Sequence, residues 1–188
     1  KGLPEFEKKG GINIYRVPCW RSKKEICHPW EQLTYIWSAK KFLKQHLKIH
    51  TYNINHAHFI IPTGIISLWL KKKYNLPYII TSHGSDVPGY NPDRFTLLHK
   101  FTKPTIRKIL DNSKGNFAGS QYLADLGNKV GSKIKYKVIR EGFNANKFKP
   151  KKKKKIILST GRLLPRKGFQ YLIKAISDKN YGYEVHIA

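Results

Sequence analysis

Residues 78–89 read YIITSHGSDVPG, a short apolar run that passes directly into a polar loop. Tyr78 to Thr81 are aromatic or largely β-branched, so they suit a buried strand. Pro77, immediately before them, is incompatible with continuation of the helical pattern that precedes it. A continuous apolar strand followed by a glycine-containing loop is typical of a parallel sheet, whose ligand-binding loops lie at the carboxyl ends of its strands.

The same alternation continues on both sides of this stretch. Apolar residues recur either at helical spacing or in short β-type runs. We expect strands at 12–17, 54–59, 78–81, 117–119 and 137–139, and helices at 29–48, 64–74, 95–110 and 121–130. Alternating strands and helices with short links predict an α/β protein with a parallel sheet and helices on both faces.

The character of the chain changes after Gly142. Residues 144–155 are polar and end in five consecutive lysines, which is typical of a linker between domains. A new strand is expected at 156–160, then a helix at 168–177 and a strand at 183–188. We therefore expect an N-terminal domain at 1–143, a hinge at 144–155, and the first βαβ unit of a second domain at 156–188.

The ends of the sequence also carry an expectation. The chain begins at Lys1, contains no methionine and stops within an expected strand, so we expect it to be cut at both ends. No apolar run approaches the roughly 18 residues of a membrane span, and no signal-peptide pattern opens the chain.

The composition is strongly basic. A formal charge of +26 over 188 residues favours anionic partners such as nucleic acid, acidic membrane or phosphorylated substrates. The excess is mostly lysine, accompanied by much isoleucine, asparagine and tyrosine, which is also how an AT-rich genome biases composition, so both explanations stay open. Cys19 and Cys27 match no zinc-ligand spacing and are expected to be free thiols.

The first candidate site is the loop at 161–168, GRLLPRKG, between an expected strand and helix. A helix N-terminus offers free N–H groups to an anion. Arg162 and Lys167 add positive charge, and with Gly161 they suit a diphosphate. The alternative is an ordinary basic loop on a basic protein.

The second candidate site is the loop of His83, Gly84, Ser85 and Asp86. Gly84 lets backbone approach a ligand closely. His83 can exchange a proton or bond sugar hydroxyls, and Asp86 can accept from hydroxyls or orient His83. The alternative is a histidine satisfied within a turn and an aspartate that caps the next segment.

A third candidate is the pair His56 and His58. At positions i and i+2 of a strand, both point to one face. Neither a carboxylate nor a third histidine lies close in sequence, so polar lining of a cleft is favoured over metal binding. No P-loop, nucleophile elbow or GxGxxG occurs. The aromatic residues lie mostly at core-like spacings, which argues against nucleic-acid binding.

In order, these motifs resemble those of glycosyltransferase family 4. The segments at 56–64 and 78–89 are similar to the family's N-terminal domain, as is FAGS at 117–120. Residues 138–150, VIREGFNANKFKP, resemble its hinge motif, commonly PNGVD followed by F-x-P. Residues 157–168 resemble the start of its C-terminal domain. The resemblance covers nearly the whole chain and rests on five motifs in the right order.

The resemblance implies a GT-B fold, in which two Rossmann-like domains face each other across a cleft. The N-terminal domain would bind mostly the acceptor and the C-terminal domain a nucleotide-sugar, without a metal or other cofactor. His83 matches the family's cleft histidine near the donor sugar, and Gly84, Ser85, Asp86 and His58 would line the same cleft. Gly161, Arg162 and Lys167 would hold the donor diphosphate and stabilise its charge as it leaves.

Two departures from the family pattern stand out. Glu141 occupies a position that is usually Asn, which puts that hinge contact in doubt. The Gly-rich loop of the N-terminal domain and the carboxylate motif of the C-terminal domain are absent. The fragment alone is therefore expected to be inactive.

Three functions follow as hypotheses. The first is a retaining hexosyltransferase that acts on a glycan or lipid-linked acceptor in cell-surface polysaccharide or lipopolysaccharide synthesis. It would be cytoplasmic, with peripheral contact at the anionic inner face of the membrane. The second is another GT-B enzyme, such as a nucleotide-sugar 2-epimerase. The third is a non-enzymatic domain that binds polyanions, whose affinity would fall steeply with salt.

Overall fold

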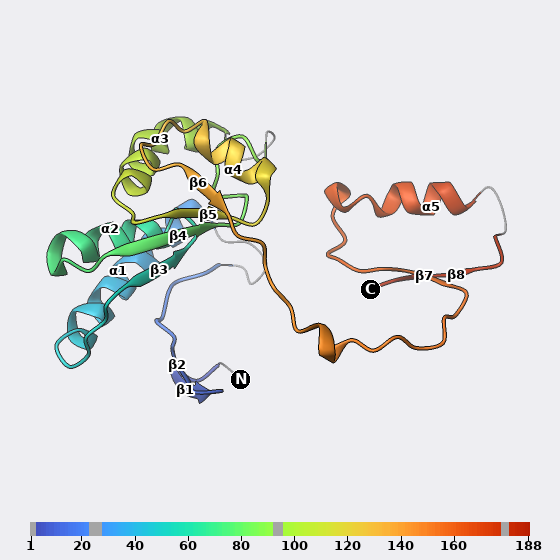
Figure 1. The fold of residues 1–188 in the computed structure, drawn as a ribbon, viewed down its shortest axis with the longest axis horizontal. Coiled ribbons are helices and arrows are strands. Elements are labelled where there is room, and N and C mark those ends of the chain that lie inside the picture. The colour runs from blue at the N-terminus through green and yellow to red at the C-terminus, as the bar shows by residue number, and fades with distance from the viewer. Residues whose placement is uncertain (1–2, 23–27, 92–95, 178–180) are drawn as a thin grey trace. The chain divides into compact units, whose positions relative to one another are not determined.

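The computed structural model describes residues 3–22, 28–91, 96–177 and 181–188, and the chain divides into two compact units at 1–142 and 143–188. Cys27, an expected free thiol, lies outside the described residues, whereas Cys19 is a free, exposed cysteine. Figure 1 shows the elements of both units.

The first unit is built around a parallel sheet of four strands. They are β3 (Asn55–His58), β4 (Tyr78–Ser82), β5 (Asn116–Ala118) and β6 (Tyr136–Val138), paired side by side in that order. The connecting helices are α2 (Thr63–Tyr74), α3 (Thr96–Asp111) and α4 (Gln121–Asn128). These bounds agree with the expected elements to within a few residues, because each run had a clear turn signal at its ends.

The core of this unit lies on one face of the sheet. Alternate strand residues Ala57, Tyr78, Ile80, Ala118 and Tyr136 are buried against apolar side chains of α2, α3 and α4. On the opposite face His56, His58 and Lys137 are exposed. The sequence predicted helices on both faces of the sheet, but α2, α3 and α4 all pack on this one face. Because the strands follow each other in sequence order, right-handed crossovers place successive helices on the same face.

Two further differences concern the start of the chain. The strand expected at 12–17 is β2 (Ile12–Tyr15), which pairs antiparallel with β1 (Phe6–Lys9) instead of joining the parallel sheet. Gly10 and Gly11 form the turn between them, with φ of 57° and 81°. Two positive φ values in a two-residue loop match the twist of a β-hairpin. The sequence predicted these glycines as the boundary of a strand, whereas in the structure they form the hairpin turn.

Helix α1 (Pro29–His46) follows and packs against α2. Ile36 and Ala39 of α1 meet Ile66 and Leu70 of α2 in a second, smaller cluster. Trp37 and Leu33 are exposed on α1. The expectation that most aromatic residues serve the core is wrong for the described residues, because Tyr78, Tyr136 and Phe169 are the buried aromatic side chains among them and many others are exposed. Trp37 stays outside the core because one stripe of α1 is sufficient to cover α2.

The second unit contains a single parallel strand pair with its crossover helix. β7 (Ile156–Ser159) pairs with β8 (Glu184–Ile187), and α5 (Phe169–Ser177) connects them. Short 3₁₀ turns occur at Ala145–Lys147 and Pro165–Lys167. The unit is thus one βαβ element of the type expected from the sequence.

Candidate functional site

The site in the first unit begins with two histidines on neighbouring strands. His58 is the last residue of β3, and His83 directly follows β4. Because β3 and β4 are parallel, with His58 in register with Thr81, their carboxyl ends lie together. The His58 Nδ1 and His83 Nε2 atoms are 2.9 Å apart. One ring must donate an N–H and the other accept it, so the pair can hold a proton at this edge of the sheet.

His56 joins the two rings on the same face of the sheet. Its ring centroid is 4.4 Å from that of His58, and its Nε2 lies 2.8 Å from Thr81 Oγ1. Desolvation lowers the pKa of His56, and repulsion from His58 and His83 lowers it further. The lowered pKa favours the neutral form of His56. Among the described residues, no group of three His, Cys, Asp or Glu side chains could hold a metal ion.

Asp86 builds the loop that carries His83. Its Oδ1 accepts from the backbone N–H groups of His83 and Gly84, each at 3.0 Å, and its Oδ2 accepts from Ile60 N–H at 2.9 Å. The side chain is buried. Both carboxylate oxygens therefore satisfy backbone donors, which supports the orienting role, while contact with substrate hydroxyls stays a prediction.

Gly84 and Ser85 form the turn between these residues. Gly84 has φ of 117°, and a Cβ there would lie 2.6 Å from a ring atom of Tyr90. The group that packs closely against Gly84, and so requires a glycine there, is therefore the Tyr90 ring. Ser85 is exposed on the same turn. Their binding of a ligand stays a prediction.

The structure adds two neighbours that the sequence did not indicate. Glu141 Oε1 lies 3.8 Å from His83 Nδ1, so the two form an ion pair when His83 is protonated. The Phe59 ring packs 4.9 Å from the His83 ring, centroid to centroid. From the sequence, Glu141 is only a departure from the family's hinge motif, which usually has Asn there. Nothing local in the sequence connects Glu141 with His83.

The candidate diphosphate site lies in the second unit, after β7. Gly161 N–H donates to Ala188 O at 2.8 Å, which ties the loop to the end of β8. Lys167 and Arg162 are both exposed, and the Lys167 Cδ atom lies 3.9 Å from the position of a Cβ on Gly161. Gly168, with φ of 76°, then leads into α5. The loop thus carries two exposed cations and leads into the N-terminus of α5, and its binding of a diphosphate stays a prediction.

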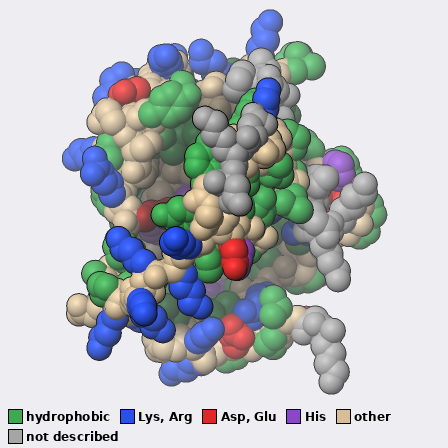
Figure 2. Space-filling model, turned by 90° about the vertical axis from the view of Figure 1, so that its right-hand side faces the viewer, with side chains coloured by type: hydrophobic (Ala, Val, Ile, Leu, Met, Phe, Trp, Pro, Cys, Tyr) green, Lys and Arg blue, Asp and Glu red, His purple; other side chains and the backbone are tan. Residues whose placement is uncertain are grey.

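Basic side chains are abundant on the protein surface. Figure 2 shows Lys and Arg side chains over much of the visible face, with few acidic side chains among them. A net charge of +26 gives the protein a positive field toward anionic ligands.

Comparison with known proteins gives similarities in family and in fold. A family model described as Glycosyltransferase Family 4 matches residues 2–147. An uncharacterized glycosyltransferase of Methanocaldococcus jannaschii is 27% identical over 81% of this chain and 42% of the relative. The Bacillus subtilis glycosyltransferase TuaC, named for teichuronic acid biosynthesis, is 32% identical over 46% of this chain and 22% of the relative.

A solved structure agrees with the fold. Sucrose-phosphate synthase from Thermosynechococcus elongatus matches 98% of this chain and 48% of its own, with a TM-score of 0.69 and 16% identity. The likeness confirms the expected α/β fold of the GT-B type. The chain spans under half the length of these relatives. Since the family model matches well over half of its residues, the chain belongs to glycosyltransferase family 4.

Proposed function

We propose that the protein containing this chain is a retaining glycosyltransferase. It moves a sugar from a nucleotide-diphosphate sugar to a glycan or a lipid-linked acceptor. Family membership supports the reaction class. The observation that carries the site assignment is the 2.9 Å contact between His58 Nδ1 and His83 Nε2 at the carboxyl ends of β3 and β4, which is where open α/β sheets bind ligands.

The proposed reaction exchanges one C–O bond for another. The bond between the sugar C1 and the diphosphate oxygen breaks, and the acceptor oxygen forms a bond to C1 on the same face. The acceptor proton passes to the leaving diphosphate. In the N-terminal domain, which would take mostly the acceptor, His83 hydrogen-bonds the donor sugar near C1. His58 and Asp86 hold that imidazole in place through its ring nitrogen and its backbone N–H.

Charge builds up on the diphosphate as the C1 bond breaks. Arg162 and Lys167 are placed on the loop after β7 to stabilise this charge, which lowers the barrier more than it tightens ground-state binding. Gly161 lies beside the Lys167 side chain, with a φ of 156° that residues with a side chain rarely adopt. With two such cations, the proposal requires no metal ion.

The acceptor class follows from chemistry and from one relative. The name of TuaC refers to the biosynthesis of teichuronic acid, which supports a role in cell-surface polysaccharide or lipopolysaccharide synthesis. Acceptors of that kind are carried on lipids, so we place the enzyme in the cytoplasm at the inner face of the membrane. The basic surface favours contact with anionic headgroups there.

The test uses the purified full-length protein and a panel of nucleotide-diphosphate sugars, with release of nucleoside diphosphate and transfer to acceptor measured separately. R162A/K167A should lower turnover at least about 100-fold, because two donors to the leaving group are lost. K152A/K153A removes the same charge from the exposed lysine run and should stay within about twofold of the parent.

Three outcomes would contradict the proposal. Turnover of R162A/K167A at the rate of the parent would reject the diphosphate site. Conversion of the donor to its 2-epimer without transfer would indicate an epimerase. Equal loss in both double variants, together with salt-sensitive binding of any polyanion, would indicate a general basic surface.

A further inference from the structure

Helix α1 carries a second apolar stripe that no described element covers. Its inner stripe packs on α2, as described above. Trp30, Leu33 and Trp37 are spaced i, i+3 and i+7, so they lie on one face of the helix, and all three are exposed. Exposed tryptophans in a row are unusual on a monomeric surface and mark an interaction site.

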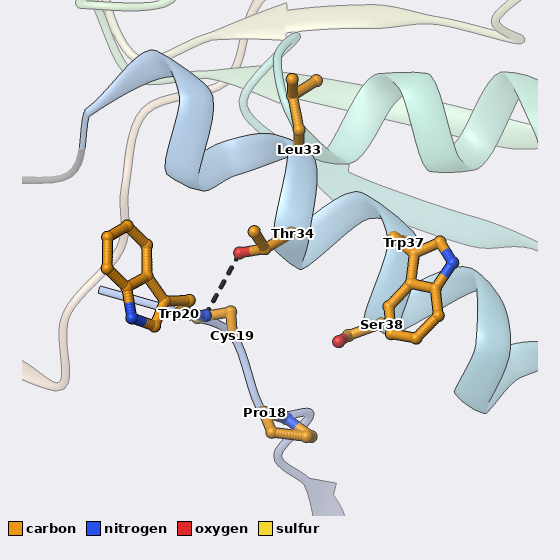
Figure 3. Close-up of a pocket in the computed structure, with 7 residues that line it drawn as sticks. All are labelled: Pro18, Cys19, Trp20, Leu33, Thr34, Trp37 and Ser38. Atoms are coloured by element: carbon orange, nitrogen blue, oxygen red, sulfur yellow. Dashed lines mark hydrogen bonds between the residues drawn. The ribbon is translucent and has the colours of Figure 1, made fainter. Parts of the chain in front are cut away.

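The segment before α1 completes this surface. Trp20 lies beside Trp30 with ring centroids 4.4 Å apart, and Trp20 N–H donates to Thr34 Oγ1 at 3.2 Å. Figure 3 shows this segment running alongside the helix. Together they form an open groove of about 670 Å³. The groove is lined by Pro18, Cys19, Trp20, Leu33, Thr34, Trp37 and Ser38.

Glu31 fixes the segment to the helix. Its Oε1 accepts from Ser22 N–H at 2.6 Å and from the Ser22 hydroxyl at 2.7 Å, and its Oε2 accepts from His28 N–H at 2.8 Å. The Ser22 N–H and then the Ser22 hydroxyl lower the pKa of Glu31 to about 2. The carboxylate thus stays ionised and is enclosed by its partners, and it is the only acid in α1.

Cations border the apolar stripe on its C-terminal side. Lys41 and Lys44 are exposed and follow within two turns of Trp37, whereas Lys40 lies over the Trp69 ring of α2. The Lys41 Nζ atom lies 5.4 Å from the centroid of the Trp37 ring. A lysine at this position can extend along the tryptophan and reach past it to an anion.

We propose that this surface, the groove together with Trp30, Lys41 and Lys44, docks onto an anionic lipid bilayer. Tryptophan prefers the level of the headgroups, where its ring is buried and its N–H stays solvated. Lysines beside it attract acidic headgroups. Side chains on the surface of α1 reach the level of the headgroups, so the contact of this surface is of the interfacial kind. Within the described part of the chain, no helix is long and apolar enough to cross a bilayer.

Two other occupants fit the surface less well. A second copy of the chain would bring together two proteins that each carry a charge of +26. A single-stranded nucleic acid would stack bases on the tryptophans but also needs cations beside each stacked base. The groove lining itself contains none, since its polar members are Thr34 and Ser38, and the nearby Lys41 and Lys44 lie only at its C-terminal border.

The inference deepens the proposed function, on which it rests for a lipid-linked acceptor at the membrane. Docking would bring the transferase to an acceptor that cannot leave the bilayer and so raise its effective concentration. Lipid binding and nucleoside diphosphate release from the donor are measured in separate assays, so either can fail while the other succeeds.

The experiment uses the full-length protein and vesicles of phosphatidylcholine, with or without about one third phosphatidylglycerol. Co-sedimentation gives the partition coefficient, and a blue shift of tryptophan emission reports insertion. The variant is L33S/W37S, whose residues are 65% and 66% exposed. The matched control is L97S/F101S on α3, with the same spacing, exposures of 69% and 74%, and a nearby lysine at Lys100.

We expect the parent to bind the anionic vesicles with a blue shift and to bind neutral ones weakly. L33S/W37S should lose at least about tenfold in partition coefficient, since two large apolar side chains no longer insert, and the control should stay within about twofold. The K41Q/K44Q variant should keep its fold but lose the preference for anionic over neutral vesicles.

Several results would overturn the proposal. If L33S/W37S keeps the partition coefficient of the parent, the docking surface is not on α1. The same conclusion follows if L33S/W37S and L97S/F101S lower the partition coefficient equally. Binding of the parent to neutral vesicles as tightly as to anionic ones would remove the role of the lysines. Loss of single-stranded DNA binding in L33S/W37S, with vesicle binding intact, would assign the surface to nucleic acid.

Discussion

Replacing Asp86 with Asn tests whether this carboxylate builds the His83 loop. The amide has one oxygen, which can still accept from the His83 and Gly84 N–H groups that Oδ1 serves. Its NH₂ would then face the Ile60 N–H, which now donates to Oδ2. One charge-assisted bond is lost, at about 1.5–3 kcal/mol, and two weaken. We expect a total loss of stability of about 2–4 kcal/mol.

The assay is thermal unfolding combined with hydrogen exchange. For a domain of this size, 1 kcal/mol corresponds to about 2–4 °C in Tm, so D86N should lower the Tm of the first unit by roughly 4–16 °C. The Ile60 amide should exchange faster than in the parent, because its partner is gone. Transfer activity should also fall by at least about tenfold, since a displaced His83 no longer meets the donor sugar.

Asp125 provides the matched control. It is exposed on α4 and accepts one bond, from Gln121 Nε2 at 2.8 Å. D125N should therefore change stability by less than about 0.5 kcal/mol. A D86N protein as stable as D125N, with unchanged exchange at Ile60, would refute the reasoning that the buried carboxylate organises the loop.

The remaining predictions concern packing and pH. A Cβ at Gly127 would lie 2.5 Å from the ring of buried Tyr136, so G127A should destabilise by about 1–3 kcal/mol. G119A, where nothing lies within 4 Å, should be neutral within about 0.5 kcal/mol in urea unfolding, and equal midpoints for the two variants would contradict the packing. Desolvation lowers the pKa of His46 and of His56. With lowered pKa values, these histidines bind fewer protons in the folded chain than in the unfolded chain. Their contribution to the free energy of unfolding is therefore present above the ordinary histidine pKa of about 6.5 and is lost as the pH falls below it. Tm should drop between pH 7.5 and pH 5.5, and a Tm that is constant or higher at pH 5.5 would contradict the lowered pKa values.

Much of the candidate site could be placed from sequence because its residues follow strands. His58 and His83 each come at the end of an expected strand, and the ends of parallel strands must meet at one edge. The sequence also placed Gly161, Arg162 and Lys167 on one loop between a strand and a helix, whereas the contact of the Lys167 side chain with Gly161 is known only from the structure. The order of motifs at 56–168 also indicated the family, which the match at 2–147 confirmed.

Other features could not be read from the chain. Whether Asp86 bonds a ligand or a backbone depends on Ile60, which comes from another strand end. Glu141 reaches His83 only because β6 lies in the same sheet as β4. Such contacts need the register of strands that are distant in sequence, and periodicity along one segment carries no information about it.

The sequence by itself determined the order of elements, the turns at glycine and proline, and the residues at each strand end, because these follow from local backbone sterics and apolar spacing. The tertiary structure decided which side of each element is covered. Helix α1 has two apolar stripes, and only the packing of α2 on Ile36 and Ala39 leaves Trp37 exposed. The reason is physical: burial belongs to a pair of surfaces, and a sequence segment describes only one of them.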